Sequence, residues 1–210
     1  MANSFKGFPP DATEFLAKLE ANNEREWFHA HKADYERAVK APMEQLLDDL
    51  DEKFGTGQSK VFRIQRDIRF SKDKTPYKTW QAAHFAAGYL SLNIDGLYVG
   101  TGAYMLDGPT LARYRDAVAD DRSGTELVKT QASLAKKGYV VEGHGDALKT
   151  VPRGYDKEHP RGELLKQKSI LVGTTIAPEA LNTPKVVTTI TKFVKDVTPL
   201  TDWLAANVWL

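Results

Sequence analysis

The segment KVFRIQRDIRFSKDKTPYKTW, residues 60–80, constrains the fold most, because it combines a strand pattern with a dense set of cations. Apolar and polar side chains alternate from Phe62 to Phe70, which is typical of a half-buried strand. Arg66 falls on the same face as two Ile and two Phe residues. Leaving that guanidinium buried without a partner would cost on the order of several kcal/mol. The pattern therefore predicts a strand in which Arg66 is paired or hydrogen-bonded.

The charge of this segment has two interpretations. Seven Lys or Arg residues between positions 60 and 78 stand against Asp67 and Asp73. Lysines on an edge strand can simply prevent pairing with another chain. Arginine, in contrast, presents a planar fork that suits carboxylate or phosphate, and Asp67 can orient its neighbours. We therefore predict an anion-binding site built from Arg63, Arg66, Arg69, Lys74, Tyr77 and Lys78.

The run RIQRDIRFSKDKTPYKT resembles the signature of a widespread bacterial family classed as a domain of unknown function. The opening FPPDATEFLAKLEANNEREWFHAHKADY, the hairpin LYVGTGAY and the later GYDKEHPRGELLKQKS are also similar to that family, so the likeness covers nearly the whole chain. The resemblance implies one bacterial-type domain. It implies no established activity or catalytic residue.

Composition excludes several classes of function. The absence of cysteine excludes disulfides, thiolate catalysis and Cys-ligated metals. Apolar runs are too short for a membrane span, and the start lacks the pattern of a secretory signal, so we expect a cytoplasmic protein without a membrane partner. The net charge is only +1, although residues 1–54 carry seven basic and twelve acidic side chains. This distribution favours a local positive cleft over a general nucleic-acid surface.

Periodicity predicts a single α+β domain over residues 1–210, with a mainly antiparallel central sheet between N-terminal and C-terminal helices. Helical spacing marks residues 1–55, where Pro42 suits the first turn of a third helix. The sheet is expected within residues 60–176, including a hairpin at Ile94-Asp95-Gly96-Leu97. Residues 184–210 are predicted as two helices that begin at Pro184 and Pro199. Gly100 and Gly102 leave one strand face without bulk, which suits a ligand, another backbone or a packed helix.

Candidate catalytic residues are His159, Asp156, Asp67 and His84. Asp156, His159 and Glu163 could form a carboxylate–imidazole group, in which a carboxylate orients a ring that titrates near neutral pH. Pro160 keeps His159 out of helical geometry, so spacing alone does not bring the three together. Metal sites are not predicted, and no cofactor is identified, because the chain lacks the phosphate-binding and nucleotide-binding loop motifs.

Three functions remain open at this point. The first is a pocket protein, or an enzyme, that binds a small phosphorylated or carboxylated molecule through the Arg-rich segment. The second is a nucleic-acid-binding module that uses the same cations, with Tyr77 or Trp80 for stacking. The third is a structural or interaction protein in which Arg66 and Asp67 belong to an internal ion-pair network.

Overall fold

A computed structural model describes residues 4–55, 59–145 and 147–209 of the chain. The ends of the predicted N-terminal and C-terminal segments, residues 1–3 and 210, lie outside the described residues. The chain divides into two compact units: residues 1–99 with 174–192, and residues 100–173 with 193–210. The prediction of a single domain is not tested by this division and stays a prediction.

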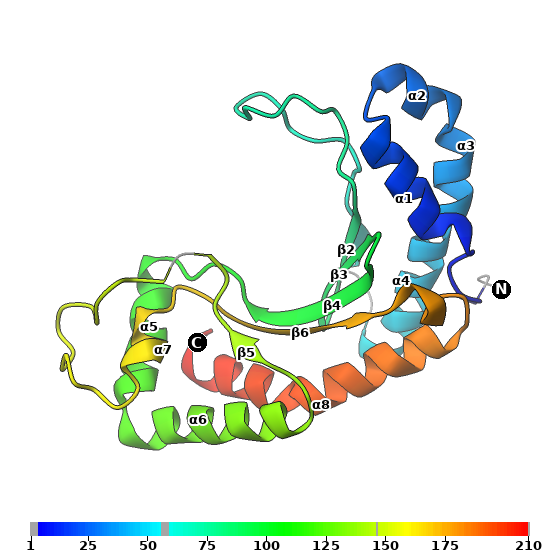
Figure 1. The fold of residues 1–210 in the computed structure, drawn as a ribbon. Coiled ribbons are helices and arrows are strands. Elements are labelled where there is room, and N and C mark those ends of the chain that lie inside the picture. Colours follow the sequence, from blue (N-terminus) through cyan, green and yellow to red (C-terminus); the bar gives the residue numbers. More distant parts are fainter. Residues whose placement is uncertain (1–3, 56–58, 146, 210) are drawn as a thin grey trace. The chain divides into compact units, whose positions relative to one another are not determined.

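The described residues confirm the α+β class. Six strands within them form one sheet in the order β1-β2-β3-β4-β6-β5. The pairs β1–β2, β2–β3 and β5–β6 are antiparallel. The strands are β1 (Lys60–Val61), β2 (Gln81–Phe85), β3 (Gly88–Asn93), β4 (Gly96–Ala103), β5 (Val141–Glu142) and β6 (Ile170–Ile176). Helices precede the sheet in sequence and follow it, as the sequence predicts (Figure 1).

The first unit begins with the helices α1 (Asp11–Ala21), α2 (Arg25–Ala30), α3 (Lys32–Tyr35) and α4 (Ala41–Phe54). A π-helical turn, Glu36–Lys40, joins α3 to α4, and Pro42 lies in the first turn of α4, as the sequence predicts. The wider turn directly before Pro42 accommodates the missing N–H of proline. Helix α4 packs against β1 and β2, and α1 packs against β3. Leu46, Leu50, Leu90 and Leu92 are completely buried in this unit.

The second unit contains the helices α5 (Gly108–Ala119), α6 (Asp121–Lys136) and α7 (Gly162–Lys166). The C-terminal helix α8 (Lys185–Asn207) belongs partly to each unit, and a 3-10 turn, Pro178–Ala180, precedes it. The prediction of two C-terminal helices is wrong, because α8 runs through Pro199 without a break. Leu200 and Leu204 beyond the proline are fully buried, and this packing offsets the backbone hydrogen bond that proline cannot donate.

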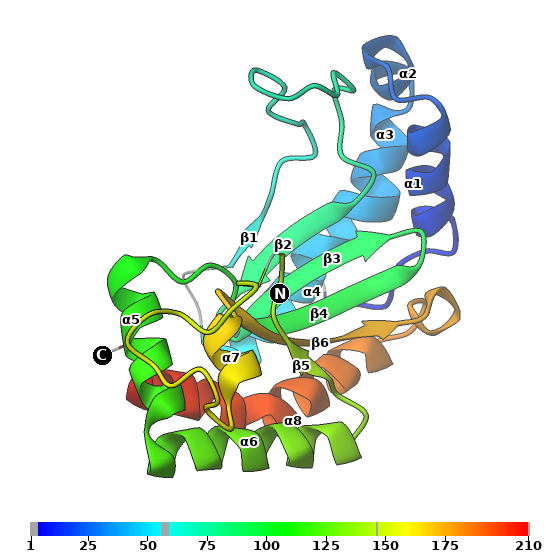
Figure 2. The same cartoon turned by 60° about the vertical axis from the view of Figure 1, so that its left-hand side comes forward.

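The predicted strand from Phe62 to Phe70 is wrong. After β1 the chain leaves the sheet and returns only at β2, so that residues 62–80 form a projecting loop, here called the basic arm (Figures 1 and 2). Ile64 is buried, but Phe62 is 36% exposed and Phe70 is 95% exposed. Arg66 is not buried on an apolar face, because the arm places its guanidinium beside Asp73. Six cations lose less hydration free energy in a solvent-exposed arm than they would in a half-buried strand.

Candidate functional site

Both limbs of the basic arm are fixed to the first unit at their base. The Phe62 N–H donates to the Ala82 carbonyl oxygen at 2.9 Å. The Gln81 side chain is completely buried, and its Nε2 donates to the Phe62 carbonyl oxygen at 2.7 Å. Its Oε1 accepts a hydrogen bond from the Tyr35 hydroxyl at 2.6 Å. The arm therefore emerges from a hydrogen-bonded, water-excluded base.

Tyr77 anchors the returning limb of the arm. Its ring is buried and stacks on Phe28, with 4.1 Å between the ring centroids. Its backbone N–H donates to Asn23 Oδ1, and its carbonyl oxygen accepts from Asn23 Nδ2, both at 3.0 Å. The predicted contact of its hydroxyl with an anion stays a prediction, but the ring itself serves the fold.

The arm is also hydrogen-bonded to itself. Arg66 N–H donates to the Pro76 carbonyl oxygen at 2.9 Å, and the side chain of Arg66 pairs with Asp73 and donates to Thr75. The Lys74 ammonium donates to the carbonyl oxygen of Ile68 at 2.9 Å. The pKa of the Asp73 carboxyl is lowered to about 2, chiefly by the hydrogen bond from Arg66. These bonds define the conformation of the arm from its base to its tip.

Arg69 and Asp67 form a second pair near the tip. Arg69 Nε lies 2.9 Å from Asp67 Oδ1, and Nη2 lies 2.6 Å from Oδ2, so the contact is bidentate. The hydrogen bond from Arg69 is the main reason why the pKa of Asp67 lies below its ordinary value. Asp67 therefore orients an arginine, as the sequence analysis predicts. Its predicted catalytic role is not tested by this contact.

Other cations of the arm keep their charge available. Within the described ranges, the side chains of Arg63 and Lys72 have no hydrogen-bond or ion-pair partner. The Lys78 ammonium donates to the Arg63 carbonyl oxygen at 2.9 Å. Burial, and secondly the charge of Arg63, lower the pKa of Lys78. Two like charges thus lie close together, and an anion placed between them would be attracted by both.

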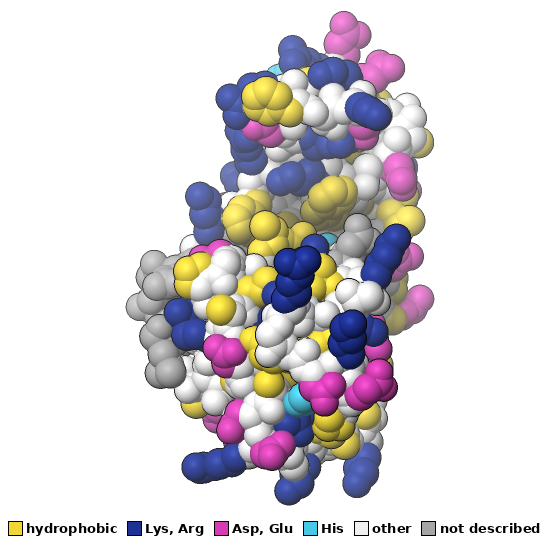
Figure 3. Space-filling view, turned by 90° about the vertical axis from the view of Figure 1, so that its left-hand side faces the viewer, with side chains coloured by type: hydrophobic (Ala, Val, Ile, Leu, Met, Phe, Trp, Pro, Cys, Tyr) yellow, Lys and Arg dark blue, Asp and Glu magenta, His cyan; other side chains and the backbone are white. Residues whose placement is uncertain are grey.

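The arm also exposes large apolar side chains among its cations. Phe70 at the tip is 95% exposed, and the Arg69 guanidinium carbon lies 5.9 Å from the centre of its ring. Phe62 and Trp80, at the two ends of the arm, are 36% and 39% exposed. Figure 3, viewed from the side on which the arm projects in Figure 1, shows Lys and Arg side chains around exposed hydrophobic ones in its upper part. The arm is therefore both cationic and aromatic.

The remaining predicted catalytic residues belong to different units. His84 lies half-buried in β2, opposite Lys60 of β1 and Tyr89 of β3. Asp156 and His159 belong to the second unit and share a turn, in which the His159 N–H donates to the Asp156 carbonyl oxygen at 3.1 Å. The Asp156 carboxylate accepts from the Glu158 N–H at 3.0 Å, not from the imidazole. The acid–base roles of these residues stay predictions.

Sequence reasoning missed the role of Arg161. Its side chain is only 10% exposed, and its Nε and Nη2 donate to the carbonyl oxygens of Val118 and Ala119 at 2.6 and 2.9 Å. These are the last carbonyls of α5, where a cation also opposes the negative end of the helix dipole. His159 supports this turn, since its Nδ1 accepts from the Arg161 N–H at 3.0 Å. No local pattern in the sequence indicates that Arg161 contacts residues some forty positions earlier.

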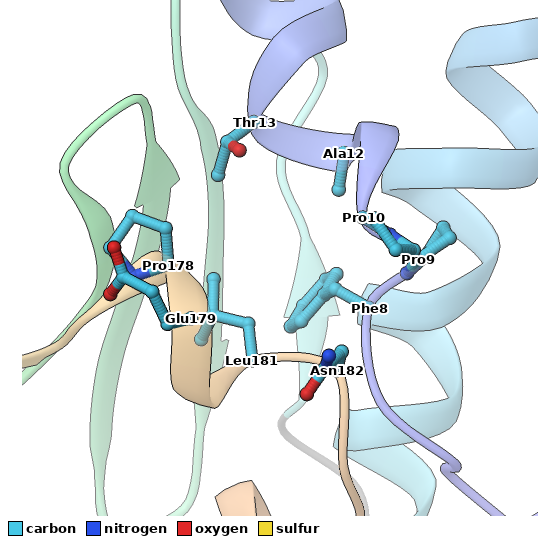
Figure 4. Close-up of a pocket in the computed structure, with 9 residues that line it drawn as sticks. All are labelled: Phe8, Pro9, Pro10, Ala12, Thr13, Pro178, Glu179, Leu181 and Asn182. Atoms are coloured by element: carbon cyan, nitrogen blue, oxygen red, sulfur yellow. The ribbon is translucent and has the colours of Figure 1, made fainter.

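Two hollows stand out in the described part of the first unit, and no cation of the arm lines either of them. The first, of about 250 Å³, is mostly apolar (Figure 4) and is lined by Phe8, Pro9, Pro10, Ala12, Thr13, Pro178, Glu179, Leu181 and Asn182. The second, here called the Trp80 hollow, has about 340 Å³ and is lined by Glu20, Thr79, Trp80, Ser91, Asn93, Ile94 and Asp95. The described residues contain no group of three or more His, Asp or Glu side chains that could hold a metal ion.

Residues 11–203, which include the whole basic arm, match the family of conserved hypothetical proteins DUF2461. The chain belongs to this family. The resemblance noted from the Arg-rich run is thereby confirmed at the level of the family. Searches of curated proteins and of solved structures found no match. Among the described residues of this family member, no helix has both the length and the apolar character needed to cross a membrane.

Proposed function

We propose that the basic arm binds single-stranded nucleic acid. The observation that carries this proposal is the interleaving of unneutralised cations with exposed rings on one projecting element. Six Lys or Arg residues lie between positions 62 and 80, and Asp67 and Asp73 neutralise two of them, which leaves a net charge of about four. Exposed rings among such cations suit unpaired bases, which stack on aromatic side chains while the cations contact phosphates.

An extended partner fits the arm better than an enclosed small molecule. The cations are distributed along the arm and line neither of the hollows in the first unit. Phe70 is almost completely exposed at the tip, where it cannot enclose a ligand but can support a base from one side. The chain as a whole is close to neutral, so the attraction would come from the arm alone.

The hydrogen bonds within the arm lower the cost of binding. Arg66 and Arg69 are held by carboxylates, and Lys74 is held by a backbone carbonyl, before any partner arrives. A loop that is already ordered loses less conformational entropy when it binds. The paired residues would therefore define the shape of the arm, while Arg63 and Lys72 would supply free charge.

A small phosphorylated ligand is the second candidate. It is favoured by one observation, the proximity of Arg63 and Lys78, which lowers the pKa of Lys78 and would be relieved by a bound phosphate. The same pair could also hold one phosphate of a nucleic-acid backbone. The two candidates differ in the number of contacts, because a small ligand would need this pair but not Lys72 or Phe70 at the tip.

Fluorescence anisotropy with labelled single-stranded RNA and DNA, at low salt, tests the proposal. The double variant Arg63→Gln/Lys72→Gln should bind at least tenfold more weakly, and Phe70→Ala should lose about 1–3 kcal/mol of stacking energy. Arg122→Gln/Lys129→Gln is the matched control, because it removes the same charges from exposed positions of α6. Equal weakening by the control, or no binding by the unmodified protein, would refute the proposal.

The small-ligand candidate is tested on the same proteins. Thermal unfolding is followed with inorganic phosphate and with mononucleotides, and a bound ligand raises the unfolding temperature. A rise that Arg63→Gln removes, but that Phe70→Ala and Lys72→Gln leave unchanged, would assign the arm to a small phosphate. A loss in all three variants would agree with the extended partner.

A further inference from the structure

The Trp80 hollow lies at the base of the basic arm and differs from the arm in charge. Its lining includes the last two residues of the arm, Thr79 and Trp80, together with residues of β3 and of the turn that follows β3. Two of the lining side chains are carboxylates, those of Glu20 and Asp95, and none is a cation. The hollow therefore combines an indole ring with negative charge.

Neither carboxylate has a cationic partner among the described residues of the first unit. Within the described residues, the Glu20 side chain has no hydrogen-bond or ion-pair partner. Among the residues that the structure describes, the Asp95 carboxylate accepts a hydrogen bond from Asn93 Nδ2 alone, at the long distance of 3.5 Å. Trp80 keeps 39% of its surface exposed. An acidic, ring-containing hollow without an internal cation is complementary to a cationic side chain next to an apolar one.

The tip of the arm has that complementary chemistry. Phe70 is 95% exposed, and the side chain of Arg69 is 76% exposed beside it. Lys72 follows without a partner among the described residues.

The positions of tip and hollow also fit a closed dimer. They lie at opposite ends of the same arm. The hollow includes residues 79 and 80, whereas Phe70 lies beyond the backbone hydrogen bonds that join Ile64 to Lys78 and Arg66 to Pro76. Two copies whose arms lie antiparallel would bring each tip to the base of the other arm. Such a contact is the same in both directions, which is the requirement for a two-fold symmetric interface.

We propose that the arm tip of one copy of this chain docks in the Trp80 hollow of a second copy, so that the two arms are exchanged in a symmetric dimer. Lys72 faces Glu20 and Asp95 of the second copy, and Phe70 covers the exposed ring of Trp80. The inference is independent of nucleic-acid binding. Single-stranded nucleic acid that occupies the tip competes with the dimer.

Sedimentation equilibrium of the full chain over a range of protein and salt concentrations tests the dimer. The unmodified protein should form a dimer that weakens as salt rises, because the contact is between charges. Glu20→Lys replaces one of the two carboxylates of the hollow by a cation, and Lys72→Glu reverses the unpaired charge of the tip. Each variant alone should dissociate at least tenfold more readily. Both residues are exposed, so the fold is expected to survive, and circular dichroism checks it.

Mixing the two variants gives the sharpest result. In the mixed dimer an unmodified tip meets an unmodified hollow, and the acid introduced at position 72 meets the cation introduced at position 20. A heterodimer should therefore form more readily than either homodimer. Lys129→Glu, an exposed charge reversal on α6, is the control and should dimerise normally. A protein that is monomeric at every concentration, a dimer insensitive to Glu20→Lys, or a mixture that stays monomeric would overturn the proposal. A basic peptide that binds the hollow of a stable monomer would overturn it as well.

Discussion

The base of the basic arm depends on Gln81, and replacing this residue by leucine gives a quantitative prediction. Gln81 is completely buried, donates to the carbonyl oxygens of Phe62 and Ala82, and accepts from the hydroxyl of Tyr35. Leucine is similar in size but can neither donate nor accept. The substitution therefore leaves the buried hydroxyl of Tyr35 and the carbonyl of Phe62 without these partners.

The loss of stability follows from the number of buried polar groups that are left without a hydrogen-bond partner. Leaving one buried polar group unsatisfied costs about 1–3 kcal/mol. The Ala82 carbonyl still accepts from the Phe62 N–H, so two groups, not three, are affected. Because the Phe62 carbonyl is only partly buried, its cost lies at the lower end, and we expect Gln81→Leu to lower the free energy of unfolding by about 2–4 kcal/mol in total. For a chain of this length the unfolding temperature should fall by about 5–15 °C.

Urea denaturation of four proteins tests this reasoning: the unmodified chain, Gln81→Leu, Tyr35→Phe and the double variant. The double variant lacks both the Tyr35 hydroxyl and the Gln81 amide, so neither group is left without its partner. It should therefore be more stable, by about 1 kcal/mol or more, than the sum of the two single effects predicts. Gln65→Leu, at an exposed position, is the control and should change stability little. Strictly additive effects of the two substitutions would refute the argument.

Three further predictions concern α5, the arm tip and the sheet. Arg161→Met should lower stability by about 2–4 kcal/mol, because it removes two charge-assisted hydrogen bonds from the end of α5, and thermal unfolding measures this. Since the pKa of Asp73 is about 2, below the ordinary 3.8, its contact with Arg66 should be complete above pH about 4 and lost as pH falls toward 2. NMR titration of the carboxyl should show this midpoint, and Arg66→Gln should raise it toward 3.8. Gly102→Ala should strongly lower the stability of the protein, because φ is +123° and a Cβ would lie 2.2 Å from the Ile170 carbonyl oxygen. Gly108→Ala is the control and should change stability little, since open space surrounds that position. Urea denaturation measures both effects.

Much of the architecture follows from local patterns. The predicted hairpin turn is present between β3 and β4, although its turn residues are Ile94 and Asp95 and Gly96 already belongs to β4. The apolar run after Ser169 is β6. The glycines of β4 were compatible with a ligand, another backbone or a helix, and Gly102 is explained by the close approach of the β6 backbone. These features can be predicted because each depends on residues that are close in the sequence or on the regular spacing of apolar side chains.

The basic arm shows why other parts of the structure could not be predicted from the sequence. Alternation from Phe62 to Phe70 matches a strand, but a strand also needs a partner along its length, and β2 pairs with only two residues of β1. The contacts that replace the strand, Asn23 with Tyr77 and Tyr35 with Gln81, join residues about fifty positions apart. A single sequence carries no signal for such pairings. The cluster of cations was nevertheless visible, because charge density is a local property.

The salt dependence of nucleic-acid binding tests the central claim most directly. If the four unneutralised cations of the arm each meet a phosphate, the logarithm of the affinity for a single strand should fall with the logarithm of salt with a slope of about −2.8. Between about 50 and about 200 mM salt the affinity should then fall about 50-fold, and for Arg63→Gln/Lys72→Gln only about 7-fold. A slope near zero, or a slope that this double variant leaves unchanged, would contradict the assignment of binding to the arm.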